Sequence, residues 1–305
     1  MLRPFKPSLA PDLANLYNEA IAAVPDTAPR PEAFFADPMV QPSLYYALRD
    51  QELMVAEEGG QIVGFVHVGV APPATVDWHP QDEPAVIRCL IYRPGHRTAG
   101  SELLAWAEQW GQAHGKRELA GWNPLYTYPY QCPRTALSER LGHVRSLLAM
   151  AGHRNLGTVA YLNWRDFTPP EPTRPELDFQ VEVSEVEGLL SHRTKLEASG
   201  PDGHYGLCLF DRGHASLLPD AEDWCYCIGL FIDEKVQGRR LGSYLLALGL
   251  REMRQHGCRH SAITVELDNP KAELFYTHVG YRYADLSTTW VKDVQVADER
   301  RSCGA

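Results

Sequence analysis

The seven residues from 237 to 243 have the composition of an anion-binding turn at the start of a helix. They read Gln237-Gly238-Arg239-Arg240-Leu241-Gly242-Ser243, and a long apolar helical pattern follows them. The first four N–H groups of a helix lack partners within it, and the helix dipole makes that end positive. Glycines let a phosphate approach the backbone, and arginines add suitable donors. The same residues would also fit a plain turn with two solvated arginines.

A second motif follows the strand that we predict over residues 262–267. Its members are Asn269, Ala272, Phe275, Tyr276, Gly280 and Tyr281. The turn is neither a Walker loop, because it lacks Gly-Lys-Ser/Thr, nor a dinucleotide fingerprint, because it lacks GxGxxG. Together the two linked motifs resemble those of the GNAT superfamily of acyl-CoA-dependent N-acetyltransferases. Arg240 departs from the pattern, because it stands where the family usually has glycine.

The resemblance implies a cofactor and a reaction. In the family, a neutral amine attacks the thioester of acetyl-CoA directly in a ternary complex. The strand before the turn, here Tyr226 to Ile232, splays from its neighbour, and its free N–H groups around residues 230–232 would bond the pantetheine and polarise the thioester carbonyl. Tyr276 occupies the position from which the family protonates the departing CoA thiolate. The alternative role for Tyr276 is that of a half-buried core aromatic.

The expected site therefore has a cofactor-binding part and a catalytic part. The residues expected to bind acetyl-CoA are Leu230, Phe231, Ile232, Gln237, Gly238, Arg239, Arg240, Leu241, Gly242, Ser243, Asn269 and Phe275. Tyr276 is the expected general acid, and Glu266 is a candidate for the base that takes the ammonium proton. Asp223 and His204 are alternative bases, although each of these groups could simply be solvated. Water can also relay the proton, and no metal is expected.

Composition and charge exclude several other classes of protein. The chain has 305 residues, of which 44% are hydrophobic and 22% charged, as is typical of globular chains that are long enough for two domains. A net charge of −10 without a basic block argues against a general nucleic-acid binder and is compatible with a cationic acceptor. No apolar run is long enough to span a bilayer, and the first residues lack the apolar core of a signal peptide, so we expect a cytoplasmic protein.

The seven cysteines do not suggest a disulfide framework. They are Cys89, Cys132, Cys208, Cys225, Cys227, Cys258 and Cys303. An odd count in a chain of this length favours reduced thiols. Cys225 and Cys227 are compatible with a metal site, but two residues that alternate on a strand share one face, which favours packing in a core or pocket. Neither is expected to be a nucleophile, because no activating histidine is placed by the sequence.

Part of the pattern occurs twice. Gly100-Ser101 recurs as Gly242-Ser243, and His114-Gly115 recurs as His256-Gly257, in both cases 142 residues later. Gly115 and Gly257 each fit the position just after a helix. We interpret the pattern as an internal repeat, with two GNAT-like domains in tandem. The proline-rich segment 168–176 is the expected stiff linker between them.

The two copies are unequal. Gly152 matches Gly280 at an offset of only 128 residues, so the first copy carries about 14 extra residues, expected within 123–146. The positions of Asn269, Ala272 and Tyr276 are held in the first copy by Leu141, Val144 and Leu148. None of these can donate a proton, so the first copy either binds acyl-CoA without catalysis or is purely structural. The second copy has a shorter leading region, and its acceptor pocket is therefore a candidate for completion by the first.

Hydrophobic periodicity predicts the elements that position these residues. Helices are expected over 9–24 and 32–35, and after Ser101. A hairpin of 53–57 and 62–68 should turn at Gly59-Gly60, and a strand is expected over 85–92. In the second copy we predict a hairpin of 205–209 and 216–218 that turns at Asp211-Arg212-Gly213.

These inferences combine into one hypothesis. The fold class is α/β (α+β), with two tandem GNAT-like domains at 1–167 and 177–294, a linker at 168–176 and a tail at 295–305. Each domain should be a mixed, mostly antiparallel sheet with a splayed central strand pair flanked by helices. The layout is similar to that of mycothiol synthase. The expected function is transfer of acetyl from acetyl-CoA to a primary amine of a small molecule; the alternative is a non-catalytic acyl-CoA-binding or sensing protein. The acceptor, the acyl-chain preference and the choice between monomer and homodimer stay open.

Overall fold

The structure, a computed structural model, describes residues 1–37, 47–72, 83–128, 131, 134–188, 192–213 and 221–294. The chain forms two compact units. Unit 1 contains Met1–Pro129, Arg134–Thr158 and Leu286–Ala305, and unit 2 contains Tyr130–Pro133 and Val159–Asp285. This division differs from the two continuous ranges expected from the sequence, because the chain passes from one unit to the other within strands β7 (Arg154–Trp164) and β13 (Arg282–Asp293).

Unit 1 is a mostly antiparallel sheet with helices on both faces. Its elements are β1 (Leu2–Pro4), η1 (Pro7–Leu9), α1 (Ala10–Ile21), α2 (Glu32–Ala36), β2 (Arg49–Glu58), β3 (Gln61–Val70), β4 (Ala85–Tyr92), α3 (Arg97–Ala113), β5 (Glu118–Gly121), β6 (Leu137–Ser138), η2 (Glu139–Leu141) and α4 (Gly142–Met150). The strand order is β1-β2-β3-β4-β5-β13, with β4 and β5 parallel. Successive residues of a strand face opposite sides, and Gly64 of β3 faces Leu103 of α3, whereas Phe65 packs on Phe35 of α2.

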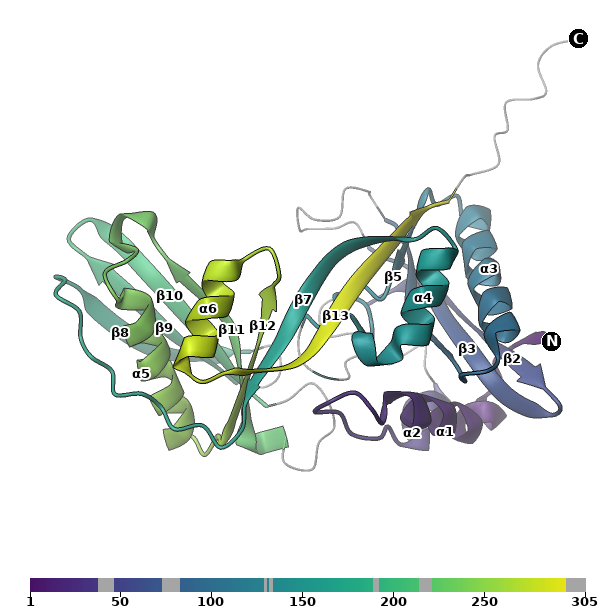
Figure 1. Cartoon of the computed structure of the whole chain (residues 1–305), viewed down its shortest axis with the longest axis horizontal. Coiled ribbons are helices and arrows are strands. Elements are labelled where there is room, and N and C mark those ends of the chain that lie inside the picture. The colour runs from purple at the N-terminus through teal and green to yellow at the C-terminus, as the bar shows by residue number, and fades with distance from the viewer. Residues whose placement is uncertain are drawn as a thin grey trace, which may run out of the picture. The chain divides into compact units, whose positions relative to one another are not determined.

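Unit 2 has the same central arrangement but fewer helices. Its elements are β8 (Gln180–Glu187), β9 (His192–Gly200), β10 (Gly203–Arg212), η3 (Ala221–Asp223), β11 (Trp224–Ile232), η4 (Glu234–Val236), α5 (Leu241–Gln255), β12 (His260–Glu266) and α6 (Pro270–Val279). The strand order is β7-β12-β11-β10-β9-β8, with β11 and β12 parallel. Figure 1 shows α5 and α6 on one side of these strands; among the described residues of unit 2, no helix covers the other side.

Most of the predicted elements of unit 1 are present. The strand predicted over 85–92 is β4, the two N-terminal helices are α1 and α2, and the hairpin turns at Gly59 and Gly60, which both have positive φ. Gly115 and Gly257 also have positive φ directly after α3 and α5, as a helix end requires. Local sequence determines these features because turn glycines and apolar periodicity act over a few residues. No helix of the described residues is long and apolar enough to cross a membrane.

The turn predicted at Asp211-Arg212-Gly213 begins too early in the chain. Strand β10 continues through Asp211 and Arg212, and it pairs antiparallel with β9 on one edge and with β11 on the other. Asp211 is fully buried in the strand because Arg193 of β9 donates to its carboxylate from Nε at 2.6 Å and from Nη2 at 3.1 Å. A long-range partner therefore overrides the local turn signal of Asp-Arg-Gly. The predicted strand 216–218, Cys132, Cys303 and the tail 295–305 lie outside the described residues.

The C-terminal end of the chain completes the sheet of unit 1. Trp290 and Val291 of β13 pair with Gly121 and Ala120 of β5, and the side chain of Val291 is 1% exposed. Trp290 is also buried, and its indole N–H donates to Thr288 at 2.8 Å. The stability of the N-terminal unit therefore depends on residues that come last in the chain.

We predict that Trp290→Ala destabilises unit 1 by about 3 kcal/mol, because truncation of a buried tryptophan leaves a cavity. Hydrogen exchange should then accelerate in peptides of β4 and β5. The matched control is Leu267→Ala in unit 2, whose side chain is 40% exposed and whose loss should change stability by less than about 0.5 kcal/mol. Faster exchange in unit 2 alone would contradict the division of the chain.

Candidate functional site

The central parallel strands of unit 2 diverge, as the resemblance implies. β11 pairs with β12 only through Trp224, Cys225 and Tyr226. On its other edge, Leu209 of β10 pairs with Gly229 and the next residue of β10 pairs with Cys227, so Ile228 is the extra residue of a bulge. A bulge bends and twists its strand. We call residues 227–232 of β11, which do not pair with β12, the splayed segment.

The far end of the splayed segment reaches solvent. Phe231 is 58% exposed, and Leu230 and Ile232 are half-buried, although all three are apolar. Large exposed apolar side chains next to unpaired backbone are unusual in a protein core and typical of binding surfaces. The three residues expected to bind pantetheine therefore lie where an apolar chain could bind beside them.

The turn after β11 has the backbone of an anion-binding helix start. Gly238 has φ +75°, and Arg240, the N-cap of α5, has φ 67° and ψ 8°, the left-handed conformation. That conformation costs a residue with a side chain about 1–2 kcal/mol relative to glycine, which explains the glycine usual at this position. Within the described chain, none of the N–H groups from Arg240 to Ser243 donates to a backbone carbonyl. These donors are available to an anion.

The side chains of the turn have different partners. Gln237 donates from Nε2 to the carbonyl of Ile232 at 2.9 Å, and Arg239 donates to the carbonyl of Glu176 in the linker at 3.2 Å. The carbonyl of Arg240 accepts from the N–H of Tyr244 at 3.1 Å, whereas its exposed guanidinium has no hydrogen-bond or ion-pair partner among the residues that the structure describes. Leu241 is buried, so only its backbone can contact a ligand. Gln237 and Arg239 thus brace the turn, and binding of a ligand by the Arg240 guanidinium stays a prediction.

Asn269 and Gly280 set the two ends of α6. The Asn269 side chain accepts from the N–H of Ala272 at 3.1 Å, which is an N-cap bond. Gly280 has φ 140°, and a Cβ there would come within 2.7 Å of the Trp164 ring. The spacing between these two residues is therefore explained by the helix itself, and a contact between Asn269 and the cofactor stays a prediction.

Tyr276 lies at the point where the strands begin to diverge. It is the one buried residue of α6, and its hydroxyl is within hydrogen-bonding reach of the thiol of Cys227, the first residue of the splayed segment. Burial is the main reason why the pKa of the Tyr276 phenol lies well above its usual value, and the thiols of Cys227 and Cys208 raise it further. The raised pKa favours the protonated form of the phenol.

Glu266 lies on the opposite side of the sheet from Tyr276. The Tyr226 and Thr264 hydroxyls are bonded to each other at 2.6 Å, so the two residues share a face, and Glu266 follows Thr264 by two positions on that same face. Cys227, which contacts Tyr276, alternates with Tyr226 and faces the α5 and α6 side. Counting from the pair Tyr226 and Ala262, Glu266 is level with residue 230 of β11. It is exposed at the end of β12.

The other predicted bases lie away from the splayed segment. Asp223 precedes the first residue of β11, at the end where β11 and β12 are paired, and forms an ion pair with Arg259 at 3.8 Å. His204 pairs with Glu197 at 3.2 Å in the hairpin of β9 and β10. Phe275 is half-buried beside Tyr276, with 5.1 Å between the ring centroids. Of the three candidates for the base, Glu266 is the one that lies level with the splayed segment, and its role stays a prediction.

The sequence analysis missed the hydroxyl pair of Tyr226 and Thr264. The pair joins β11 to β12 at the last position before they diverge, on the face that carries Glu266. Strand alternation predicts that Tyr226 and Cys227 lie on opposite faces of the sheet. Only the pairing of β11 with β12 brings Thr264 next to Tyr226. These hydroxyls and the Glu266 carboxylate form a polar row that a water-mediated proton path could follow.

The cysteines are packed in the interior. Cys89, Cys208, Cys225, Cys227 and Cys258 are buried free thiols. Cys225 and Cys227 pair with Arg212 and Phe210 and share a face, as strand alternation predicts. Within the described ranges, no group of three or more His, Cys, Asp or Glu residues is arranged to hold a metal ion.

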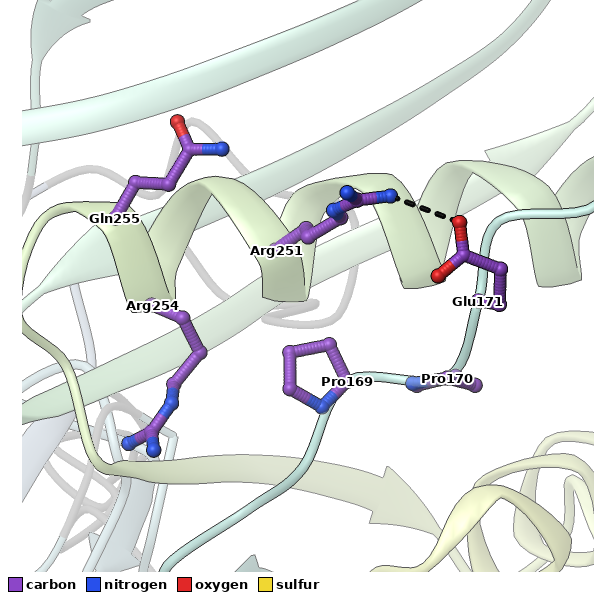
Figure 2. A pocket seen from close by; sticks show the side chains of 6 residues that line it. All are labelled: Pro169, Pro170, Glu171, Arg251, Arg254 and Gln255. Carbon is purple, nitrogen blue, oxygen red and sulfur yellow. Dashed lines mark hydrogen bonds and ion pairs between the residues drawn. The ribbon is translucent and has the colours of Figure 1, made fainter.

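A hollow of about 370 Å³ occurs elsewhere in unit 2. It is lined by Pro169, Pro170, Glu171, Arg251, Arg254 and Gln255 (Figure 2). Arg251 and Glu171 form an ion pair at 3.1 Å that holds the linker against the C-terminal half of α5. The turn of residues 237–243 lies at the other end of that helix, about 15 Å away at 1.5 Å per residue, so the hollow does not belong to the candidate site.

Comparisons with known proteins agree with the architecture. The sequence profile of the Acetyltransferase (GNAT) family matches residues 19–143 and again residues 158–281. The search of curated proteins finds no significant match.

Solved structures share the two-unit fold at low sequence identity. A tandem GNAT protein from the clavulanic acid biosynthesis pathway is 15% identical, with a TM-score of 0.66 over 98% of this chain and 99% of its own. A GCN5-related glucosamine N-acetyltransferase region of a fungal multi-domain β-N-acetylglucosaminidase is also 15% identical, with a TM-score of 0.66 over 96% of this chain and 38% of its own. A GCN5-related N-acetyltransferase from Sphaerobacter thermophilus is 16% identical, with a TM-score of 0.61 over 97% and 96%. With both halves matched by the family profile, the chain belongs to the GNAT acetyltransferase family, in a tandem arrangement.

Proposed function

We propose that unit 2 transfers the acetyl group of acetyl-CoA to a primary amine by direct attack in a ternary complex. The observation that carries the proposal is the arrangement of Tyr276 and Glu266 on opposite faces of the diverging strands. A proton donor on one side and a carboxylate on the other suit a reaction in which the thiolate departs on the first side and the amine arrives on the second. The working site is thus in the second copy.

The cofactor would bind along β11 and the turn. Its pyrophosphate would accept from the N–H groups of residues 240–243 and from the Arg240 guanidinium. Its pantetheine would lie beside Leu230, Phe231 and Ile232, where N–H groups of the splayed segment would stabilise the negative charge that develops on the thioester oxygen. These apolar and polar parts match a molecule that has a diphosphate at one end and a thioester at the other.

The chemical step requires two proton movements. The neutral amine attacks the carbonyl carbon, a C–N bond forms, and the C–S bond then breaks. The phenol of Tyr276 gives its proton to the departing thiolate, and the amine proton leaves toward Glu266, directly or through water beside the Tyr226 and Thr264 hydroxyls. The phenol recovers a proton from solvent before the next turnover.

The acceptor that we propose is a small amine. The face of the unit 2 sheet that carries Glu266 has no helix over it within the described residues, and the protein has a net charge of −10, which suits a cationic acceptor before deprotonation. A region that acetylates glucosamine shares this fold. Buried free thiols fit the reducing cytoplasm that we propose as its location.

The rival function is binding or sensing of acyl-CoA without catalysis. It would need the turn and the splayed segment but no proton donor. The Tyr276 phenol lies beside the first residue of the splayed segment, and burial raises its pKa. A protein that only binds acyl-CoA would need this residue for packing alone. Turnover with any amine of a panel of amino sugars, polyamines and amino acid derivatives would exclude the rival.

The first test concerns the turn. We predict that Gly242→Glu abolishes acetyl-CoA binding in titration calorimetry, because a carboxylate would lie beside the N–H groups meant for the pyrophosphate. The variant should fold, since a Cβ at Gly242 meets Ile232 at an ordinary 3.4 Å. The matched control is Gln255→Glu, which adds the same charge at the far end of α5. Unchanged affinity of Gly242→Glu would refute the cofactor site.

The second test separates charge from backbone strain at Arg240. Arg240→Gly and Arg240→Ala both remove the guanidinium, so we expect each to weaken acetyl-CoA binding about tenfold, the worth of one charge-assisted hydrogen bond. Glycine also relieves the left-handed strain, so Arg240→Gly should be about 1 kcal/mol more stable than Arg240→Ala. Arg239→Ala, which removes the brace to Glu176, should affect binding less. Equal losses at both arginines would show that Arg240 has no special role.

The third test concerns proton donation. Tyr276→Phe retains the ring, so the fold and acetyl-CoA affinity should persist, while kcat falls by ~10²-fold or more. Because the phenol pKa is raised, wild-type kcat should not decline up to about pH 10, where an ordinary tyrosine would begin to ionise. Wild-type kcat in Tyr276→Phe across this range would return Tyr276 to a packing role and make water the donor.

A further inference from the structure

The corresponding strand of unit 1 also diverges from its neighbour, but it is buried. β4 pairs with β5 only through Ala85, Val86 and Ile87, and a bulge at Arg88 matches the bulge at Ile228. Every residue of β4 is nevertheless buried, including Tyr92 at 4% exposure, whereas Phe231 of β11 is 58% exposed. Something within unit 1 therefore covers the strand that a cofactor would need.

Tyr92 and His143 provide this cover. The Tyr92 hydroxyl donates to the carbonyl of His143 at 2.9 Å, and Nε2 of His143 donates to the carbonyl of Tyr92, also at 2.9 Å. Their rings meet edge to face with 4.8 Å between centroids. The Tyr92 ring also fills the space in front of Gly100 in the first turn of α3, where a Cβ would come within 2.7 Å of it. One side chain thus bridges the end of β4, the start of α3 and the start of α4.

A second contact closes the root of the diverging strands in unit 1. The Thr127 hydroxyl donates to the carbonyl of Arg88 at 2.9 Å, and the Arg88 guanidinium lies over the Tyr128 ring at 4.8 Å. Leu148, which is fully buried, holds the position of Tyr276. Backbone and apolar groups at which a pantetheine would bind are therefore already occupied by side chains of the same unit.

Unit 2 has other residues at the positions of Tyr92 and His143. Ile232 replaces Tyr92, and Lys271, which is exposed, replaces His143. The carbonyl of Ile232 accepts from Gln237 of its own turn instead of from α6. Helix α3 packs against α4, whereas α5 and α6 contact each other less. The two copies thus differ in one contact. A side-chain bridge joins the end of β4 to α4 in unit 1, and the corresponding residues of β11 and α6 in unit 2 do not form it.

We propose that the Tyr92–His143 pair occupies the place of acyl-CoA in unit 1, so that each chain binds a single acetyl-CoA, in unit 2. Unit 1 would then fold without a cofactor. Its own side chains would make the contacts that acetyl-CoA makes in unit 2. The proposal rests on the function proposed for unit 2 only for the identity of the ligand; the closure of unit 1 is a property of its own contacts.

The test is the stoichiometry and location of acetyl-CoA binding to the full chain. Titration calorimetry should give one site per chain. Hydrogen exchange followed by mass spectrometry should show the same protection of residues 88–92 with and without acetyl-CoA, whereas residues 228–243 should gain protection when acetyl-CoA binds. Two sites, or new protection in residues 88–100, would overturn the proposal. Absence of any binding would instead refute the function proposed for unit 2, so the two failures are distinguishable.

Charge-reversal variants assign the binding to one unit. Arg97→Glu, at the start of α3 in unit 1, should leave the affinity for acetyl-CoA within twofold of wild type, whereas Arg240→Glu at the start of α5 should lower it more than tenfold. Arg97 and Arg240 are both exposed, so both variants should fold. An equal loss in the two variants would overturn the proposal.

A further pair of variants tests the bridge itself. Tyr92→Phe loses only the bond to the His143 carbonyl and should lower the melting temperature and speed exchange in residues 88–92 without changing the acetyl-CoA stoichiometry. His143→Ala should do the same, because it removes the donor to the Tyr92 carbonyl. If neither variant changes exchange in residues 88–92, the pair does not close the strand and the proposal fails.

Discussion

The divergence of β11 from β12 is the feature on which the proposed site depends. The pairing of β11 with β12 ends after Tyr226, just before the bulge at Ile228 in the ladder with β10, and leaves one edge of β11 unpaired with β12. Unpaired polar backbone is costly when it is buried without a partner. A protein that keeps such a feature must cover it with its own side chains or leave it for a ligand.

The two units give the two solutions to this constraint. In unit 1 the cost of the bulge at Arg88 is met internally, by Thr127 at the root of the divergence and by Tyr92 and His143 at its end. In unit 2 the end of β11 stays exposed. The phenol of Tyr276 lies on one face of the diverging strands, and the carboxylate of Glu266 lies on the other. Under the proposed function, unit 1 would be structural and unit 2 would carry the reaction.

The left-handed backbone of Arg240 is a second costly feature that the structure retains. Glycine would adopt this backbone without strain, but only a side chain with a positive charge can add to the attraction for a diphosphate. Strained residues that persist in folded proteins tend to occur at functional sites, because the surrounding structure must hold them. Here Gln237 and Arg239 hold the turn from either side, through the carbonyls of Ile232 and Glu176.

The amino-acid sequence by itself determined the local features of this protein. The bounds of β4, the glycine turn of the first hairpin, the helix ends at Gly115 and Gly257 and the turn that begins α5 were predictable, because each depends on residues that are close together in the chain. The spacing from Asn269 to Gly280 is local for the same reason, because these two residues are the N-cap and the C-cap of one helix, α6.

Only the tertiary structure decided which residues face one another. The assignment of Tyr276 and Glu266 to opposite faces depends on the register of β11 and β12, and the burial of Asp211 depends on Arg193 of the neighbouring strand. The passage of β7 and β13 between the two units, and the bridge of Tyr92 and His143, join segments more than fifty residues apart. Such contacts leave no local pattern, because strand alternation and helix periodicity specify which side a residue faces but not what lies there.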